Sequence, residues 1–187
     1  MQLASLETFH DWCADSPIQA ENREWSEGHF SLELTSRSGT TESREWSTPY
    51  ETKTLLAFVT ALLDTLSPFD YCWVLKREGK WWDQGENEGL EPVLRSLGIP
   101  ADFEGALRFT ADERPALTLL VTAQIAFGWS GYYDLWVVPD HGRALLRTDD
   151  DDFTTLYFTD PTPIEPVVQQ MASAGFEPST DHAAADA

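Results

Sequence analysis

The densest group of chemically active side chains in this sequence is a run of four aspartates at residues 149–152. A calcium loop of the EF-hand type needs oxygen ligands at alternating positions, a glycine at its sixth position and a closing glutamate. Phe153 and Thr154 follow the run directly, and the glycine and the glutamate are missing. Since runs of like charge usually face water, the sequence favours a solvated turn, then contact with a basic partner, and a metal site least of all. The candidate residues are Asp149, Asp150, Asp151 and Asp152.

A pair of adjacent tryptophans followed by carboxylates forms the second candidate. Adjacent side chains of a strand point to opposite faces, so at least one of the two indoles is expected to face solvent or a partner. Aromatic anchors beside carboxylates suit a protein interface, and the same pair would suit stacking on a sugar ring. The simpler interpretation is that one tryptophan covers the core and the other lies along the surface. This group consists of Trp81, Trp82, Asp83, Glu86, Glu88 and Glu91.

Catalytic motifs are not recognisable in the sequence. The letters G-W-S-G at residues 128–131 approach the G-x-S-x-G nucleophile elbow, but Tyr132 replaces the last glycine and a turn is expected instead. A glycosidase needs two carboxylates across a cleft, and the abundance of carboxylates gives no basis for choosing a pair. Glycine-rich phosphate-binding loops are also absent from the sequence. We therefore expect no enzymatic activity and no cofactor, and interpret Trp129, Tyr132 and Tyr133 as aromatic anchors for a partner.

Three residues could contribute to a zinc site. His10 and Cys13 are three residues apart on an expected helix, and with Cys72 they could supply three of the four ligands that zinc prefers. No C-x-x-C or H-x-x-x-H motif adds a fourth ligand, so packed or surface side chains are the better interpretation. The two cysteines could form one disulfide, but reduced, partly buried thiols in a cytosolic protein are favoured. We expect no metal site.

Acidic residues dominate the composition. The 187-residue chain contains 32 acidic and 12 basic residues, which gives a formal net charge of −20. It also contains eight tryptophans, ten phenylalanines and five tyrosines, whereas a disordered acidic tail would be poor in aromatic residues. A folded domain with a strongly negative surface is therefore expected. Such a surface repels nucleic acid and anionic lipid and attracts basic partners.

The length fits a single domain, and we place its globular part at residues 1–177 and a flexible C-terminal tail at residues 178–187. The N-terminus has neither the basic start nor the sustained apolar stretch of a signal peptide. The most apolar segment, residues 116–129, is interrupted by polar side chains and is shorter than the roughly 20 residues needed to span a bilayer. These features predict a cytoplasmic protein without membrane contact, and a monomer is favoured.

Apolar spacing and capping residues predict helices at residues 3–15, 48–67, 92–97 and 162–175. In the second helix, Thr48 is expected to be the cap, with Pro49 at the first helical position and Glu51 completing a capping box. In the last helix, Gly175 is expected to end the helix in the left-handed conformation.

Alternation of apolar and polar side chains predicts the strands. Residues 29–35 and 42–47 are expected to pair as a hairpin around a turn at residues 36–41. Further strands are expected at residues 69–75, 106–110, 117–127, 132–138, 144–148 and 153–158, with a turn at residues 139–142. The order of elements predicts an α+β fold of one domain, in which a mainly antiparallel sheet is covered by helices on one side.

Part of the C-terminal half resembles a known group of proteins. The segments D-L-W-V-V-P (residues 134–139), L-L-R-T-D-D (residues 145–150) and L-Y-F (residues 156–158) are similar to small bacterial α+β proteins, some of them encoded beside polymorphic-toxin genes. The pattern of that group has an aromatic residue after the proline turn and T-H-E before G-P-Y-F. Here Gly142 and Arg143, then T-D-D, then T-L-Y-F stand in those places. The resemblance carries no catalytic residue, and it implies an immunity-type protein.

The charge, the aromatic residues and this resemblance together predict a non-enzymatic immunity protein, or antitoxin. It would neutralise a basic toxin domain that acts on nucleic acid or nucleotides by occluding the active site of that domain. The partner is thus expected to be a protein, without direct binding of nucleic acid. The alternatives are a DNA-mimic inhibitor of a nucleic-acid enzyme, and a carbohydrate- or small-ligand-binding module that uses Trp81 and Trp82.

Overall fold

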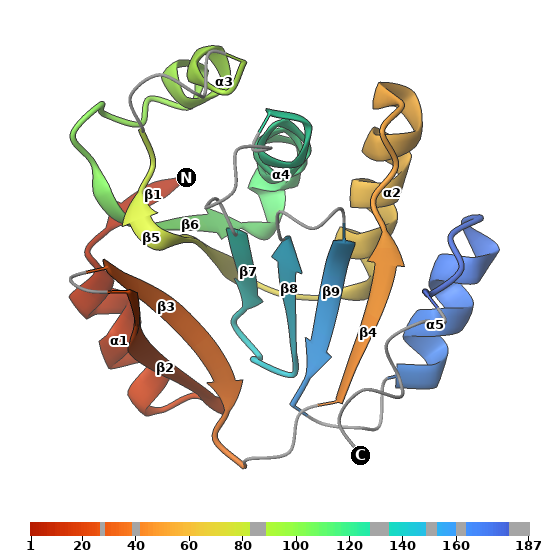
Figure 1. Cartoon of the computed structure of the whole chain (residues 1–187), viewed down its shortest axis with the longest axis horizontal. Coiled ribbons are helices and arrows are strands. Elements are labelled where there is room, and N and C mark those ends of the chain that lie inside the picture. Colours follow the sequence, from red (N-terminus) through yellow and green to blue (C-terminus); the bar gives the residue numbers. More distant parts are fainter. Residues whose placement is uncertain are drawn as a thin grey trace.

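The computed structural model describes residues 1–26, 29–38, 42–82, 89–127, 135–148, 153–159 and 164–179. Within these residues the chain builds one large sheet and one small sheet, together with helices that pack on the large one (Figure 1). The fold is α+β with a mainly antiparallel sheet, as the sequence predicts.

The large sheet spans most of the chain. Within the described residues its strands are β1 (Gln2–Ala4), β4 (Glu42–Ser47), β5 (Tyr71–Lys80), β6 (Glu104–Thr110), β7 (Leu135–Pro139), β8 (Ala144–Thr148) and β9 (Phe153–Phe158). Their order across the sheet is β1-β6-β5-β7-β8-β9-β4, and every neighbouring pair is antiparallel. β1 and β4 therefore form the two edges of the sheet.

One face of this sheet is covered by α2 (Thr52–Thr65), α4 (Arg114–Phe127) and α5 (Ile164–Ser173) (Figure 1). The short helix α3 (Glu91–Ser96) lies against α4. A 3-10 turn, η1 (Ala111–Glu113), leads into α4. The strands contribute alternate side chains to this first core, for example the fully buried Cys72 and Val74 of β5. Each fully buried aliphatic side chain stabilises the fold by about 1.5–3 kcal/mol.

The opposite face is covered by α1 (Leu6–Ala14) and by the small sheet, a hairpin of β2 (Ile18–Ser26) and β3 (His29–Ser36). The other side chains of β5, Trp73 and Leu75, point into this second core. Phe9 of α1 meets Trp73 edge to face, with ring centroids 5.7 Å apart. α1 thus lies on the other side of the sheet from α2, α4 and α5, so the sheet is covered on both faces and not on one.

The predicted hairpin of residues 29–35 and 42–47 is wrong in its pairing, although both segments are strands. β3 pairs with β2, and β4 pairs with β9 in the large sheet. The buried side chains explain the separation, because Leu32 and Leu34 belong to the second core and Trp46 to the first. The sequence patterns do not predict β2.

The predicted strand at residues 117–127 is wrong, because α4 covers this segment. Leu117, Leu120, Val121 and Gln124 are buried and recur at three- and four-residue spacing on one face of the helix, and the small Ala123 beside them is buried too. A capping box precedes it, in which the Glu113 carboxylate accepts hydrogen bonds from the Thr110 amide at 2.9 Å and the Thr110 hydroxyl at 3.2 Å. No helix in the described part of the chain combines the length and the apolar character needed to cross a membrane.

Helix α2 begins later than the sequence predicts. Its N-cap is Glu51, whose carboxylate accepts hydrogen bonds from the amides of Lys53 at 3.1 Å and Thr54 at 2.7 Å. Thr48, the predicted cap, places its hydroxyl 3.0 Å from that of Thr154 in β9. The hydrogen bond from the Thr54 hydroxyl, followed by those from the two amides, lowers the pKa of the Glu51 carboxyl.

Helix α5 ends at the predicted glycine. Gly175 adopts a φ of +92°, and the Phe176 amide donates to the Met171 carbonyl at 3.0 Å, as in a Schellman motif. The chain then reaches β4, where the Ser179 amide donates to the Glu45 carbonyl at 2.7 Å. The first residues of the predicted tail therefore contact the sheet edge. The predicted start of this helix at residue 162 and residues 180–187 lie outside the described residues.

Candidate functional site

Most of the predicted partner-binding residues lie outside the described part of the chain. The structure places the two tryptophans at residues 81 and 82, and Glu91, which forms an ion pair with Arg95. The residues outside the described part are Asp83, Glu86, Glu88, Trp129, Tyr132, Tyr133, Asp149, Asp150, Asp151 and Asp152. In the sequence, the four aspartates stand between β8 and β9.

Trp81 and Trp82 have different environments. Trp81 is fully buried in the first core, and its indole N–H donates to the Gly105 carbonyl at 2.9 Å. Trp82 is half-buried, donates its indole N–H to the Ile99 carbonyl at 3.2 Å, and has the Arg95 guanidinium carbon 5.2 Å from its ring centroid. Trp81 is therefore a core residue whose side chain reaches no partner, and only Trp82 extends to the surface. Because Arg95 lies over one face of the Trp82 ring, that face is not open to a sugar ring.

The cysteines do not assemble a metal site with His10. Cys13 and Cys72 are free, are buried, and belong to the cores on opposite faces of the sheet. Burial raises the pKa of each thiol to about 12, so both are neutral near physiological pH. In the described part of the chain, no group of three or more His, Cys, Asp or Glu side chains could hold a metal ion.

The described surface is strongly acidic. Its exposed acidic residues are Glu7, Asp11, Asp15, Glu21, Glu42, Glu51, Asp64, Asp70, Asp102, Glu104, Asp112, Glu165 and Glu177. Its exposed basic residues are Arg37, Lys53, Arg95 and Arg143. The ion pairs found between described residues are Asp64–Arg114 at 2.6 Å, Glu91–Arg95, and Glu113 with the amino group of Met1. For most exposed carboxylates, no ion pair with another described residue is found, and these carboxylates add to a negative potential.

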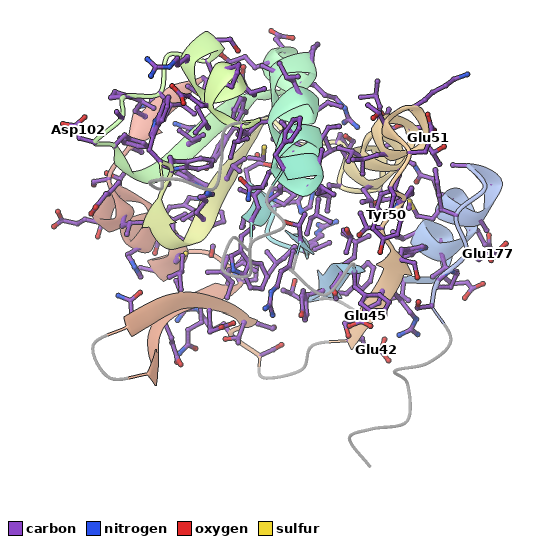
Figure 2. All side chains as sticks on the ribbon, turned by 45° about the horizontal axis from the view of Figure 1, so that its top comes forward. Glu42, Glu45, Tyr50, Glu51, Asp102 and Glu177 are labelled. Atoms are coloured by element: carbon purple, nitrogen blue, oxygen red, sulfur yellow. The ribbon has the colours of Figure 1, made fainter. Side chains whose placement is uncertain are left out.

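Several carboxylates gather on the side of the molecule formed by β4. We define the β4 edge surface as Glu42, Glu45, Tyr50, Glu51 and Glu177, which Figure 2 shows together on one side of the molecule. The hydrogen bond between the Ser179 amide and the Glu45 carbonyl holds the segment that carries Glu177 beside β4. Tyr50 is 67% exposed, so an aromatic ring stands among the carboxylates.

The side chains of β4 alternate between the two faces of the sheet. Trp46 is 1% exposed and packs in the first core, so Glu45 points to the opposite face, as do Ser43 and Ser47. Both serines are exposed, and Glu45 itself is half-buried. This face of β4 is therefore open to solvent on each side of Glu45.

Next to Glu45 the sheet carries a row of polar side chains on the same face. The strand register places Thr155 of β9 opposite Glu45, and Arg147 of β8 and Trp136 of β7 continue the row. The Arg147 guanidinium carbon lies 5.6 Å from the Trp136 ring centroid. Thr155 is 1% exposed, and its Oγ1 and the Oε2 of Glu45 are enclosed without a hydrogen-bond partner. We call Glu45, Thr155, Arg147 and Trp136 the polar row. The lone pairs of its carboxylate and hydroxyl can accept from a cationic donor.

No family model matches the chain, and no curated protein and no solved structure is significantly similar to it.

Sequence patterns do not single out Glu45, Tyr50 or Thr155. The alternation within residues 42–47 could have indicated that Glu45 lies on the opposite face from Trp46. Its neighbour Thr155 could not be found in this way, because the pairing of β4 with β9 joins segments that are far apart in the chain.

Proposed function

We propose that this chain is an immunity-type binding protein that neutralises a basic toxin domain by covering the active site of that domain. The observation that carries the proposal is the negative surface, formed by a net charge of −20 and by exposed carboxylates of which most lack a basic neighbour among the described residues. A toxin that acts on nucleic acid or nucleotides needs a positive cleft, because its substrate is anionic. A negative protein surface is complementary to such a cleft.

Charge complementarity favours rapid capture of the toxin. Electrostatic attraction can raise the association rate constant to about 10⁸–10⁹ M⁻¹s⁻¹ at low salt. The β4 edge surface adds Tyr50, an aromatic side chain of the kind that forms the centre of many interfaces. Inhibition then requires only that the surface occupies the cleft, and this chain needs no chemistry of its own.

We further propose that the protein is a cytoplasmic monomer that binds one toxin domain. The free, buried thiols of Cys13 and Cys72 support a reducing compartment. The charge that attracts a basic protein also repels nucleic acid and anionic lipid, so neither is proposed as a direct partner.

Affinity capture followed by kinetics tests the proposal. The full chain is used to capture proteins from the cell of origin, and the captured protein is purified and expressed alone and with the chain. We expect a basic protein whose toxicity is suppressed by co-expression. Its association rate constant, measured by surface plasmon resonance, should fall by about an order of magnitude or more from low to high salt. A captured protein that remains toxic when it is co-expressed with the chain would contradict the proposal. So would an association rate constant that does not change with salt concentration.

A further inference from the structure

Two neighbouring threonines of β9 are equally buried but differ in hydrogen bonding. Thr154 and Thr155 are each 1% exposed. The Thr154 hydroxyl lies 3.0 Å from that of Thr48, whereas Oγ1 of Thr155 has no hydrogen-bond partner. A buried hydroxyl without a partner lowers the stability of the fold, and the hydroxyl at position 155 is therefore an acceptor that a donor from a binding partner could satisfy.

Glu45, which lies directly opposite Thr155, also has a buried oxygen, Oε2, without a hydrogen-bond partner. The terminal torsion of a glutamate is soft, so the carboxylate can turn to present either oxygen. Ser43 and Ser47 flank Glu45 on this face of β4 and are exposed, but the two unpaired oxygens are themselves enclosed, so a partner side chain reaches them only when the Glu45 carboxylate turns.

The charges near this position favour a cation. Glu51 and Glu177 belong to the same side of the molecule as Glu45 (Figure 2), while Glu42 and Arg44 alternate with Glu45 on β4 and point to the other face. The basic member of the polar row, Arg147, lies on β8, two strands from β4, with its guanidinium near the Trp136 ring. Arg147 stands directly opposite Thr155 on its inner side, so carboxylates predominate only toward the β4 edge, where a partner would approach.

From these features we infer that Glu45 and Thr155 form a socket for an arginine side chain of the basic partner. The inference rests on the proposed function, and it adds the place and the chemistry of the contact. A guanidinium carries several N–H donors in one plane, so it can donate to the Glu45 carboxylate and to Oγ1 of Thr155 together. A lysine ammonium is a compact point charge and matches a pair of neighbouring acceptors less well.

The test uses the isotope-labelled full chain and a short synthetic peptide of arginine and glycine as the probe. The same peptide with citrulline in place of arginine keeps the side-chain shape and removes the charge. In an NMR titration, only the arginine peptide should shift the backbone amide signals of Glu45 and Thr155. The variants Glu45→Gln and Thr155→Val should each bind this peptide about tenfold more weakly, as expected when one hydrogen bond to a charged group is weakened or lost.

Thr154→Val is the matched control, because Thr154 has the same type and burial as Thr155 and occupies the neighbouring position. Thr154→Val should lower Tm, since the hydrogen bond with Thr48 is lost, and should leave peptide binding unchanged. Thr155→Val should keep or raise Tm, since it removes a hydroxyl without a partner, and should still weaken binding. A side chain that serves only the fold cannot produce this combination.

Three results would each overturn the socket: equal binding of the citrulline peptide, wild-type peptide affinity in Thr155→Val, or a fall in Tm of Thr155→Val that matches Thr154→Val. The captured toxin domain separates this failure from that of the proposed function. If the captured domain binds wild type and Thr155→Val equally, the socket is wrong and the proposed function stands. If no basic partner is captured, the proposed function is wrong, whether or not the arginine peptide binds.

Discussion

Replacing Trp81 with phenylalanine should destabilise the fold without altering the surface. Trp81 is fully buried, and its indole N–H donates to the Gly105 carbonyl at 2.9 Å. Loss of this donor leaves a buried carbonyl unsatisfied, at about 1–3 kcal/mol. The smaller ring also leaves a cavity, which adds about 1 kcal/mol. The free energy of unfolding should therefore fall by roughly 2–4 kcal/mol, and each kcal/mol lowers Tm by about 2–4 °C in a domain of this size.

Urea unfolding followed by far-UV circular dichroism measures this loss, and Trp82→Phe is its matched control. Trp82 is half-buried and its hydrogen bond to the Ile99 carbonyl is longer, at 3.2 Å, so its replacement should cost less than about 1 kcal/mol. Equal losses in the two variants would refute the reasoning. So would a Trp81→Phe variant that keeps the wild-type Tm but loses affinity for the partner, because Trp81 would then be an interface residue.

Three further outcomes are expected. Gly105 has a φ of +155°, and a Cβ there would overlap the carbonyl oxygen of Ala4, so Gly105→Ala should detach β1 from β6, which faster hydrogen exchange of the β1 amides would report. Because burial raises the pKa of Cys13 and Cys72 to about 12, mass spectrometry should find neither thiol alkylated by iodoacetamide in the native protein at mildly alkaline pH, and both alkylated in urea. The hydrogen bonds that lower the pKa of Glu51 favour its ionised form, so their stabilisation is present above the ordinary value of 4.5 and is lost as the pH falls through the lower folded-state value. Glu51→Gln should accordingly have a lower Tm than wild type at neutral pH, and the difference should shrink in acid.

Local patterns predict the elements whose buried side chains recur without interruption. Helix α2 and strands β8 and β9 lie within the predicted segments. The prediction fails at residues 117–127 because Leu119 and the β-branched Thr122 lie between the buried positions of α4 and Ile125 follows them, which hides the helical period. The predicted pairing of β3 with β4 is wrong for another reason. A short connection favours a local hairpin, but β3 and β4 bury their side chains in cores on opposite faces of the sheet.

Composition predicts the sign of the surface charge but not the place where a partner makes contact. Adjacent tryptophans must diverge, yet which of the two is buried depends on the Gly105 carbonyl of β6, and no pattern around residue 81 indicates that partner. The socket has the same origin. Glu45 and Thr155 are ordinary strand residues in their own segments, and their unsatisfied oxygens become neighbours only because β4 joins the sheet beside β9. Long-range pairing therefore decides the features from which the contact is inferred.

The same carboxylates should give opposite salt responses in folding and in binding. In the free chain, a net charge of −20 means self-repulsion, which salt screens, so the free energy of unfolding should rise with ionic strength. Exposed ion pairs such as Glu91–Arg95 oppose this trend only weakly, since each contributes about 0–1 kcal/mol. In the complex the carboxylates face a basic partner, so the same screening should slow association. Denaturation and association kinetics measured over one salt series test both signs. If stability and the association rate constant fell together, the carboxylates would be neutralised mainly inside the fold and could not serve as the surface that attracts a toxin domain.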